Sequence, residues 1–159
     1  MEQVICKTTN KPLITTKQQF WELCASGSSF QNYSMIDLDL SGEDFSGISF
    51  RGMNMAGVNL SYAILTCCDL SSSHFSGANF ELAELQDANM EFSFFDDANF
   101  SEANLTQAWL MGSDFSEAVF DGANLSGVTG DLAVFDQASF LNTDTDGARF
   151  LMATGVTLA

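Results

Sequence analysis

The sequence predicts an all-β solenoid in which short extended segments and tight corners alternate every five residues. The main observation is a period of five: from Phe30 to Leu125, every fifth residue is Leu, Phe or Met, at twenty consecutive positions. Twelve of the fifteen Phe residues occupy this position, which we call the repeat position i. Gly130 and Thr145 interrupt the series near its end. Such regular self-similarity is the signature of a repeat architecture.

Small apolar residues precede the repeat position by two. Position i−2 is Ala in twelve repeats, while larger residues such as Leu38 and Met53 occupy it in the first repeats. In extended backbone, residues two apart point to the same side, so i−2 and i can both face a core. Neither helical spacing nor unbroken alternation accounts for a period of five. A short extended piece followed by a corner accounts for it.

The corner has its own residue preferences. Ten of the twelve Gly residues lie at i+2, and i−1 is commonly Asn or Asp. Glycine adopts positive φ without steric cost, which several turn types require. Asn and Asp side chains bond to nearby backbone and tolerate tight bends. These preferences predict one corner in every five residues.

Several blocks of the chain resemble the repeat unit of the pentapeptide-repeat family, Ala-Asp/Asn-Leu-x-x. The clearest are Ala98–Glu102, Ala103–Gln107 and Ala123–Gly127, and the resemblance covers about four fifths of the chain. It implies a right-handed quadrilateral parallel β-helix in which four pentapeptides make one coil.

Residues twenty positions apart are of the same type, as a four-sided coil requires. Two columns are rich in Phe and a third is mostly Leu. This segregation supports twenty residues per coil and about six coils. The expected core ladder consists of Phe75, Phe80, Phe95, Phe100, Phe115 and Phe120.

We expect three segments: an N-terminal cap at 1–25, the repeats at 26–150, and a tail at 151–159 that serves as a C-terminal cap or a self-association edge. Thr16 and Gln19 match a capping box, and apolar residues follow them, so a short helix is expected in the cap. The helix should cover the first coil, because an uncapped end exposes core and strand edges.

The formal net charge of −16 is the second large feature of the chain. Between Ser26 and Phe150, nineteen acids stand against Arg51 and Arg149, and no acid occupies a repeat position. Such a surface disfavours nucleic acid and anionic membranes and favours basic protein partners. No apolar run matches a signal peptide or a membrane span, so a cytoplasmic location is expected, with non-classical export left open.

We expect no catalytic, metal or cofactor site. Cys67 and His74 form a conceivable nucleophile pair, but no orienting group is evident, and a solvated wall histidine is the better interpretation. Acid pairs such as Asp96–Asp97 and Glu43–Asp44 are best interpreted as solvated charge on convex walls. The four cysteines lack the paired spacing of metal ligands.

The four walls differ in charge. The wall of repeat positions 30, 50, 70, 90, 110 and 150 has three acids and both arginines, whereas the others have six, four and six acids and no base. We call the first the near-neutral wall. It also carries large outward apolar residues that suggest a partner or homodimer interface, which we call the apolar strip. The apolar strip consists of Phe92, Trp109, Met111, Leu132, Leu151 and Met152. The acids of the other walls include Glu84, Asp87, Asp96, Asp97, Asp114 and Glu117.

Three functional interpretations remain open, because fold alone does not determine function. The first is a non-catalytic acidic interaction module that binds a protein through a solenoid wall. The second follows from the resemblance: some acidic bacterial members mimic DNA at gyrase or topoisomerase IV and confer quinolone resistance or toxin immunity. The protruding loops of the plasmid-borne resistance members and a long C-terminal dimerisation helix are missing from this sequence. The third is a bacterial effector that acts in a host cell.

Overall fold

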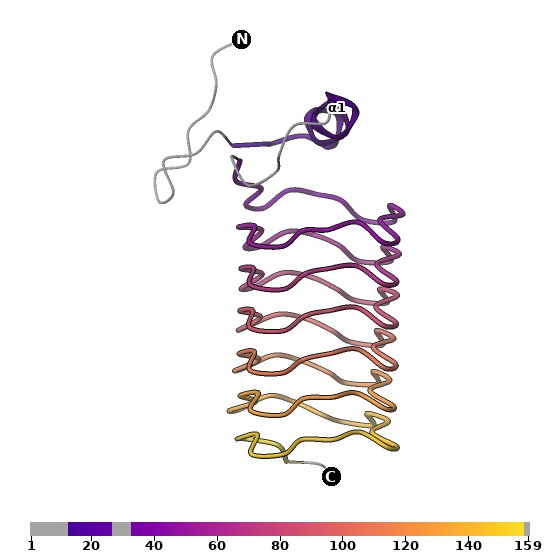
Figure 1. The fold of residues 1–159 in the computed structure, drawn as a ribbon, viewed down its shortest axis with the longest axis vertical. Helices are drawn as coiled ribbons and strands as arrows, with labels where there is room; N and C mark the ends of the chain where they lie inside the picture. Colours follow the sequence, from indigo (N-terminus) through magenta and orange to yellow (C-terminus); the bar gives the residue numbers. More distant parts are fainter. Residues whose placement is uncertain (1–12, 27–32, 158–159) are drawn as a thin grey trace.

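The computed structural model describes residues 13–26 and 33–157, which form a rod of stacked coils with one helix across its N-terminal end (Figure 1). The repeat position at Phe30 and residues 1–12 of the expected N-terminal cap lie outside the described residues. Within the described ranges, no helix has the length and apolar character needed to cross a membrane.

The coils are held together by parallel pairing between residues twenty positions apart. The first such bridge joins Ser34 to Asn54, and the last joins Val134 to Thr154. Each coil contributes one bridging residue on each of its faces. The backbone N–H of Phe100, for example, donates to the carbonyl oxygen of Val119 at 2.7 Å. The expected twenty-residue coil is therefore confirmed. Because each face contributes one bridging residue, the pairing in the described part of the chain consists of isolated bridges and not of longer strands.

The only helix in the described residues, α1, spans Lys17–Ser26. Its capping box is confirmed: the Gln19 N–H donates to Thr16 Oγ1 at 3.2 Å, and the Thr16 N–H donates to Gln19 Oε1 at 3.2 Å. These two bonds satisfy backbone donors that the first helical turn leaves free.

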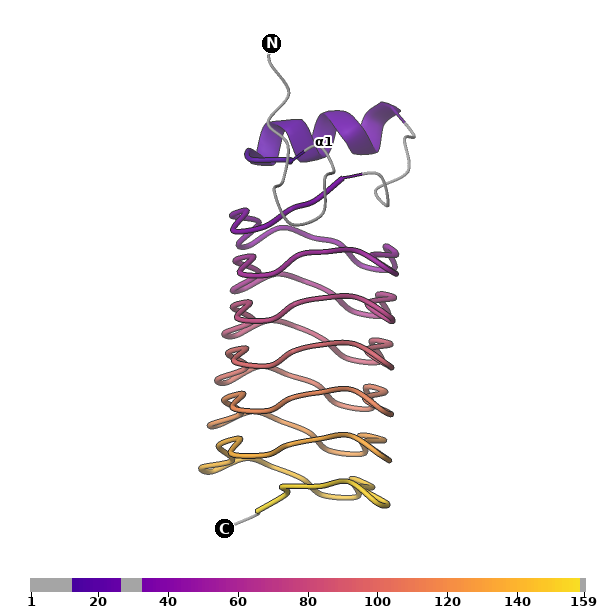
Figure 2. The same ribbon diagram turned by 90° about the vertical axis from the view of Figure 1, so that its left-hand side faces the viewer.

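The helix α1 lies across the end of the rod and closes its core (Figure 2). Phe20 is fully buried, and its ring centroid lies 5.5 Å from that of Phe45 and 6.3 Å from that of Phe50. Trp21 stacks on Phe45 at 5.6 Å. An ion pair of 2.8 Å between Lys17 Nζ and Glu43 Oε1 ties the start of the helix to the coils.

Every corner uses the same left-handed residue. All i+2 residues from Asp37 to Met152 have positive φ, and in most corners the next N–H closes the turn, as in the 3.0 Å bond from Ala103 N to Phe100 O. This is the type II turn, which favours Gly at that position. Fifteen of these corner residues are not glycine, however, and each left-handed L-residue costs on the order of 1 kcal/mol. The expected Asx bonds also form, as from the Ser101 N–H to Asn99 Oδ1 at 3.0 Å.

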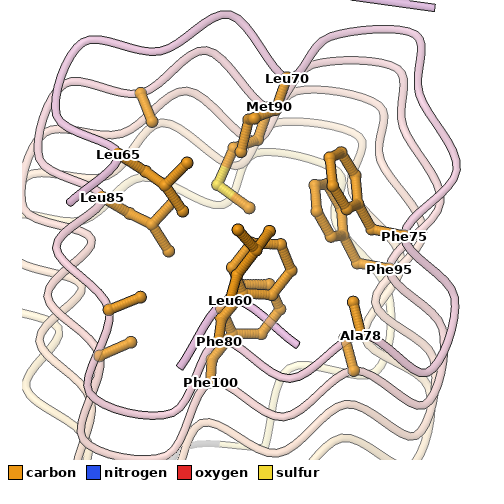
Figure 3. Packing of buried hydrophobic residues seen from close by; sticks show 14 of the residues in the cluster. Leu60, Leu65, Leu70, Phe75, Ala78, Phe80, Leu85, Met90, Phe95 and Phe100 are labelled. Carbon is orange, nitrogen blue, oxygen red and sulfur yellow. The ribbon is translucent and has the colours of Figure 1, made fainter. Parts of the chain in front are cut away.

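The core is a column of side chains from the repeat positions, and Figure 3 shows its two stacks of Phe rings. Phe75 and Phe95 stack at 5.3 Å, and Phe80 and Phe100 stack at 4.8 Å. All six members of the expected core ladder have no exposed surface. The residues two positions before them are three Ala and three Ser, all buried, and all small enough to fit beside the rings.

Gly130 interrupts the period for a structural reason. A Cβ built on Gly130 would lie 2.7 Å from Cδ1 of Phe150, so the ring from the next coil fills the space that a side chain at 130 would take. The coil pattern continues through Thr154, whose N–H donates to the carbonyl oxygen of Ala133 at 3.0 Å.

Candidate protein-interaction surface

The apolar strip follows one corner of the rod, where the near-neutral wall turns into the next face. Backbone bonds tie its residues across coils: Phe92 N donates to Met111 O at 3.0 Å, and Leu132 N donates to Leu151 O at 2.9 Å. Phe92, Trp109 and Leu132 are 53–56% exposed. Leu151 and Met152 are exposed further, and Met111 is half-buried. The structure therefore places five of the six predicted residues along one edge and Trp109 on the adjoining face.

Large apolar residues at the left-handed corner position are confined to two of the four corners. Phe92, Leu132 and Met152 lie on the corner of the apolar strip, and Tyr62 and Leu82 lie on the corner diagonally opposite. The other two corners carry Gly, Asp, Glu, Gln and one Cys at this position. A bulky apolar residue here costs both backbone strain and exposure of apolar surface. Residues retained at such a cost are a reason to infer function.

A ladder of buried serines lies under the apolar strip, and sequence reasoning missed it. Ser93 Oγ donates to Leu70 O at 2.9 Å and accepts the N–H of Ser73 at 3.2 Å, while Ser93 N donates to Ser113 Oγ at 3.0 Å. These serines replace Ala at i−2 in three successive coils, which is the signal that the sequence offered. The ladder joins successive coils at the corner that carries Phe92.

Both arginines beside the apolar strip bond to a neighbouring side chain. Asp131 accepts Arg149 Nε at 3.1 Å and the Leu151 N–H at 3.0 Å. Arg51 donates to Ser71 Oγ at 2.7 Å. Because three acids stand against two arginines on this wall, its net charge stays close to zero around its apolar residues.

The predicted acidic residues divide between two opposite walls. The wall that follows the apolar strip carries Asp96, Asp97, Asp114 and Glu117. The wall on the opposite side of the rod from that one carries Glu84 and Asp87. Asp97, Glu117, Glu84 and Asp87 are exposed. Asp96 and Asp114 are half-buried and accept bonds from Ser76 Oγ at 2.7 Å and Ser116 Oγ at 2.6 Å.

The groups considered for catalysis are spread over different faces. His74 stacks on Phe94, with ring centroids 4.7 Å apart, on the face that follows the apolar strip. Cys67 lies at the corner that precedes the near-neutral wall. Among the described residues, no group of three or more His, Cys, Asp or Glu is placed to hold a metal ion.

The family model that matches the chain describes pentapeptide repeats, in eight copies, over segments that together run from residue 34 to residue 150. The chain therefore belongs to the pentapeptide-repeat family, whose members fold as right-handed quadrilateral β-helices.

Among solved structures, a trypsin-treated variant of QnrB1, a plasmid-mediated fluoroquinolone resistance protein, is similar in fold. It is 21% identical, with a TM-score of 0.50, over 80% of this chain and 76% of that one. A pentapeptide-repeat protein of the Arabidopsis thaliana thylakoid lumen is 30% identical, with a TM-score of 0.41, over 75% and 70% of the two chains. Rfr23 of the cyanobacterium Cyanothece 51142 is 19% identical, with a TM-score of 0.39, over 84% and 93%. No curated protein sequence matches significantly.

Proposed function

We propose that this protein is a non-catalytic, acidic interaction module that binds a protein partner through the apolar strip. The observation that carries the proposal is the restriction of large, exposed, left-handed apolar residues to particular corners, one of which adjoins the exposed Trp109. The β-helix fold does not require large apolar residues at its corners, since nine other corner positions are glycine. Clustered aromatic and aliphatic side chains on a polar surface are typical of binding sites.

The test is capture of partners from a lysate with the wild-type protein and with Trp109→Asp. Aspartate suits this position structurally, because Asp69 occupies the same column two coils away. The matched control is Tyr62→Asp on the opposite corner. We expect Trp109→Asp to remove a captured protein that Tyr62→Asp retains, or to change the oligomeric mass. If both variants match the wild type in mass and in captured proteins, the proposal is wrong.

DNA mimicry at gyrase or topoisomerase IV is the second candidate. The net charge of −16 and the rod shape favour it, and QnrB1, which has a similar fold, is named as a fluoroquinolone resistance protein. A DNA mimic would act through the acidic walls in the cytoplasm and would inhibit DNA supercoiling by gyrase. The inhibition should weaken steeply with salt, because binding between a charged rod and a basic DNA site is screened. No inhibition at low and at physiological salt would exclude this candidate.

A further inference from the structure

We propose that the segment bound by the apolar strip is an amphipathic helix of another protein, with an apolar stripe and lysine or arginine residues along one flank. This inference rests on the proposed function, and it names the chemistry of the partner.

The apolar part of the strip has the length of a short helix. Phe92, Leu132 and Met152 belong to one corner column, with Gly112 between the first two. The three coil steps from 92 to 152 span roughly 14 Å at about 4.8 Å per coil. A helix of about ten residues has the same length, and its apolar stripe repeats every 5–6 Å or so. The coil spacing therefore matches the spacing of the apolar residues on such a helix.

The charges around the apolar strip are arranged asymmetrically. The wall that follows it carries Asp96, Asp97, Asp114 and Glu117. On the side of Trp109 the neighbouring face residues are Asn89, Thr129 and Arg149, and the acids are Glu91 and Asp131, which pairs with Arg149. A bound segment would therefore have one flank over four acids and the other over a nearly neutral surface. The exposed rings of Phe94 and Trp109 add sites where a cationic side chain can pack on an aromatic face.

A second copy of this chain fits the strip less well. The five exposed residues present roughly 100 Å² each, or roughly 500 Å² in all, if about half of a large side chain is exposed. A stable interface between folded proteins buries about 800 Å² on each partner. In addition, two chains of charge −16 repel one another. The small area and the negative charge both favour a short basic segment.

The experiment uses two synthetic fifteen-residue peptides. Both carry Leu at helical i, i+3, i+4 and i+7 spacing, and one flank is Lys in the first peptide and Glu in the second. The protein carries Trp21→Phe, so that emission from Trp109 reports contact at the apolar strip. We expect the Lys peptide to shift this emission to the blue and to bind at least about ten-fold more tightly than the Glu peptide.

Variants then localise the site. We expect Phe92→Asn and Leu132→Asn each to weaken binding of the Lys peptide by about ten-fold. Tyr62→Asn, the matched control at the same turn position on the opposite corner, should leave it unchanged. Asparagine suits all three positions, since Asn142 already occupies a left-handed corner with φ of 58°.

Several results would overturn the inference. The first is equal affinity of the protein for the two peptides. The second is unchanged affinity of the Phe92→Asn and Leu132→Asn variants for the Lys peptide. The third is no binding at about 1 mM peptide, which corresponds to very weak association. If Trp109→Asp still abolishes capture of a partner in any of these cases, the proposed function stands and only the basic helix is excluded. If Leu132→Asn lowers the oligomeric mass in sedimentation, a second copy is the occupant.

Discussion

The ring of Phe92 lies over Gly112 of the next coil, where an added Cβ would stand 2.8 Å from the ring atoms Cδ1 and Cε1. Both residues occupy the left-handed corner position, with φ of 54° and 67°. The missing side chain at 112 lets the Phe92 ring lie along the corner, and this contact sets the shape of the apolar strip.

Gly112→Ala should therefore destabilise the fold more than Gly77→Ala. Both glycines have positive φ, near 67° and 65°, so both substitutions carry the same backbone strain, but no atom lies within 4 Å of a Cβ built on Gly77. We expect Gly112→Ala to cost about 1 kcal/mol more in the free energy of unfolding, measured by urea titration. In a Phe92→Asn background the difference should vanish. Equal costs in the wild-type background would mean that the ring moves aside freely.

Phe100→Ala should be among the most destabilising substitutions in the chain. The Phe100 ring has no exposed surface and stacks between Phe80 at 4.8 Å and Phe120 at 5.0 Å. Removing it leaves a cavity in the middle of the column, which costs about 3–5 kcal/mol in chemical denaturation. A loss below about 1 kcal/mol would show that the column closes over the gap.

Leu132→Asn should leave stability unchanged or raise it, although it removes a large side chain. Leu132 is 53% exposed and has φ of 62°, a conformation that asparagine adopts more easily than leucine. We expect a change in the free energy of unfolding between zero and about 1 kcal/mol of stabilisation. A loss of more than about 1 kcal/mol would contradict the view that the residue serves binding and not the fold.

The adjacent thiols Cys67 and Cys68 should differ sharply in reactivity. Cys67 is exposed, whereas Cys68 is 1% exposed and its Sγ donates to Phe45 O at 2.9 Å. Burial raises the pKa of the Cys68 thiol from 9.0 to about 11. In a protein carrying Cys6→Ser and Cys24→Ser, one thiol should react with a disulfide reagent at pH 8, and mass spectrometry should place the adduct on Cys67. Equal labelling of both cysteines would contradict the structure.

The raised pKa of the Cys68 thiol predicts that the folded protein loses stability at alkaline pH. The folded state disfavours the Cys68 thiolate. The contribution of the protonated Cys68 thiol to the free energy of unfolding is therefore fully present below pH 9 and is lost as the pH rises through about 11. Cys68→Ala, which places the common small residue at this position, should show a smaller alkaline loss in the free energy of unfolding. Identical pH profiles would show that other groups govern the alkaline transition.

Much of the fold was predictable from the sequence, because each five-residue unit repeats the same local chemistry. The period of apolar residues such as Phe95 and Phe100 identified the core, and residues twenty apart identified the coil. Glycine identified only some of the corners in the sequence. Other residues, such as Glu117, adopt the same positive φ at corners, and the stacking of the coils offsets the conformational cost.

The sequence by itself determined which residues face inward, through the five-residue period, and how many make one coil, through the recurrence of residue types every twenty positions. The tertiary structure alone decided that Phe150 fills the space beside Gly130 and that Phe92 covers Gly112. It also decided that Ser73, Ser93 and Ser113 form one bonded ladder under the apolar strip. These relationships join residues twenty positions apart, and their distances depend on how neighbouring coils stack, which no local pattern specifies.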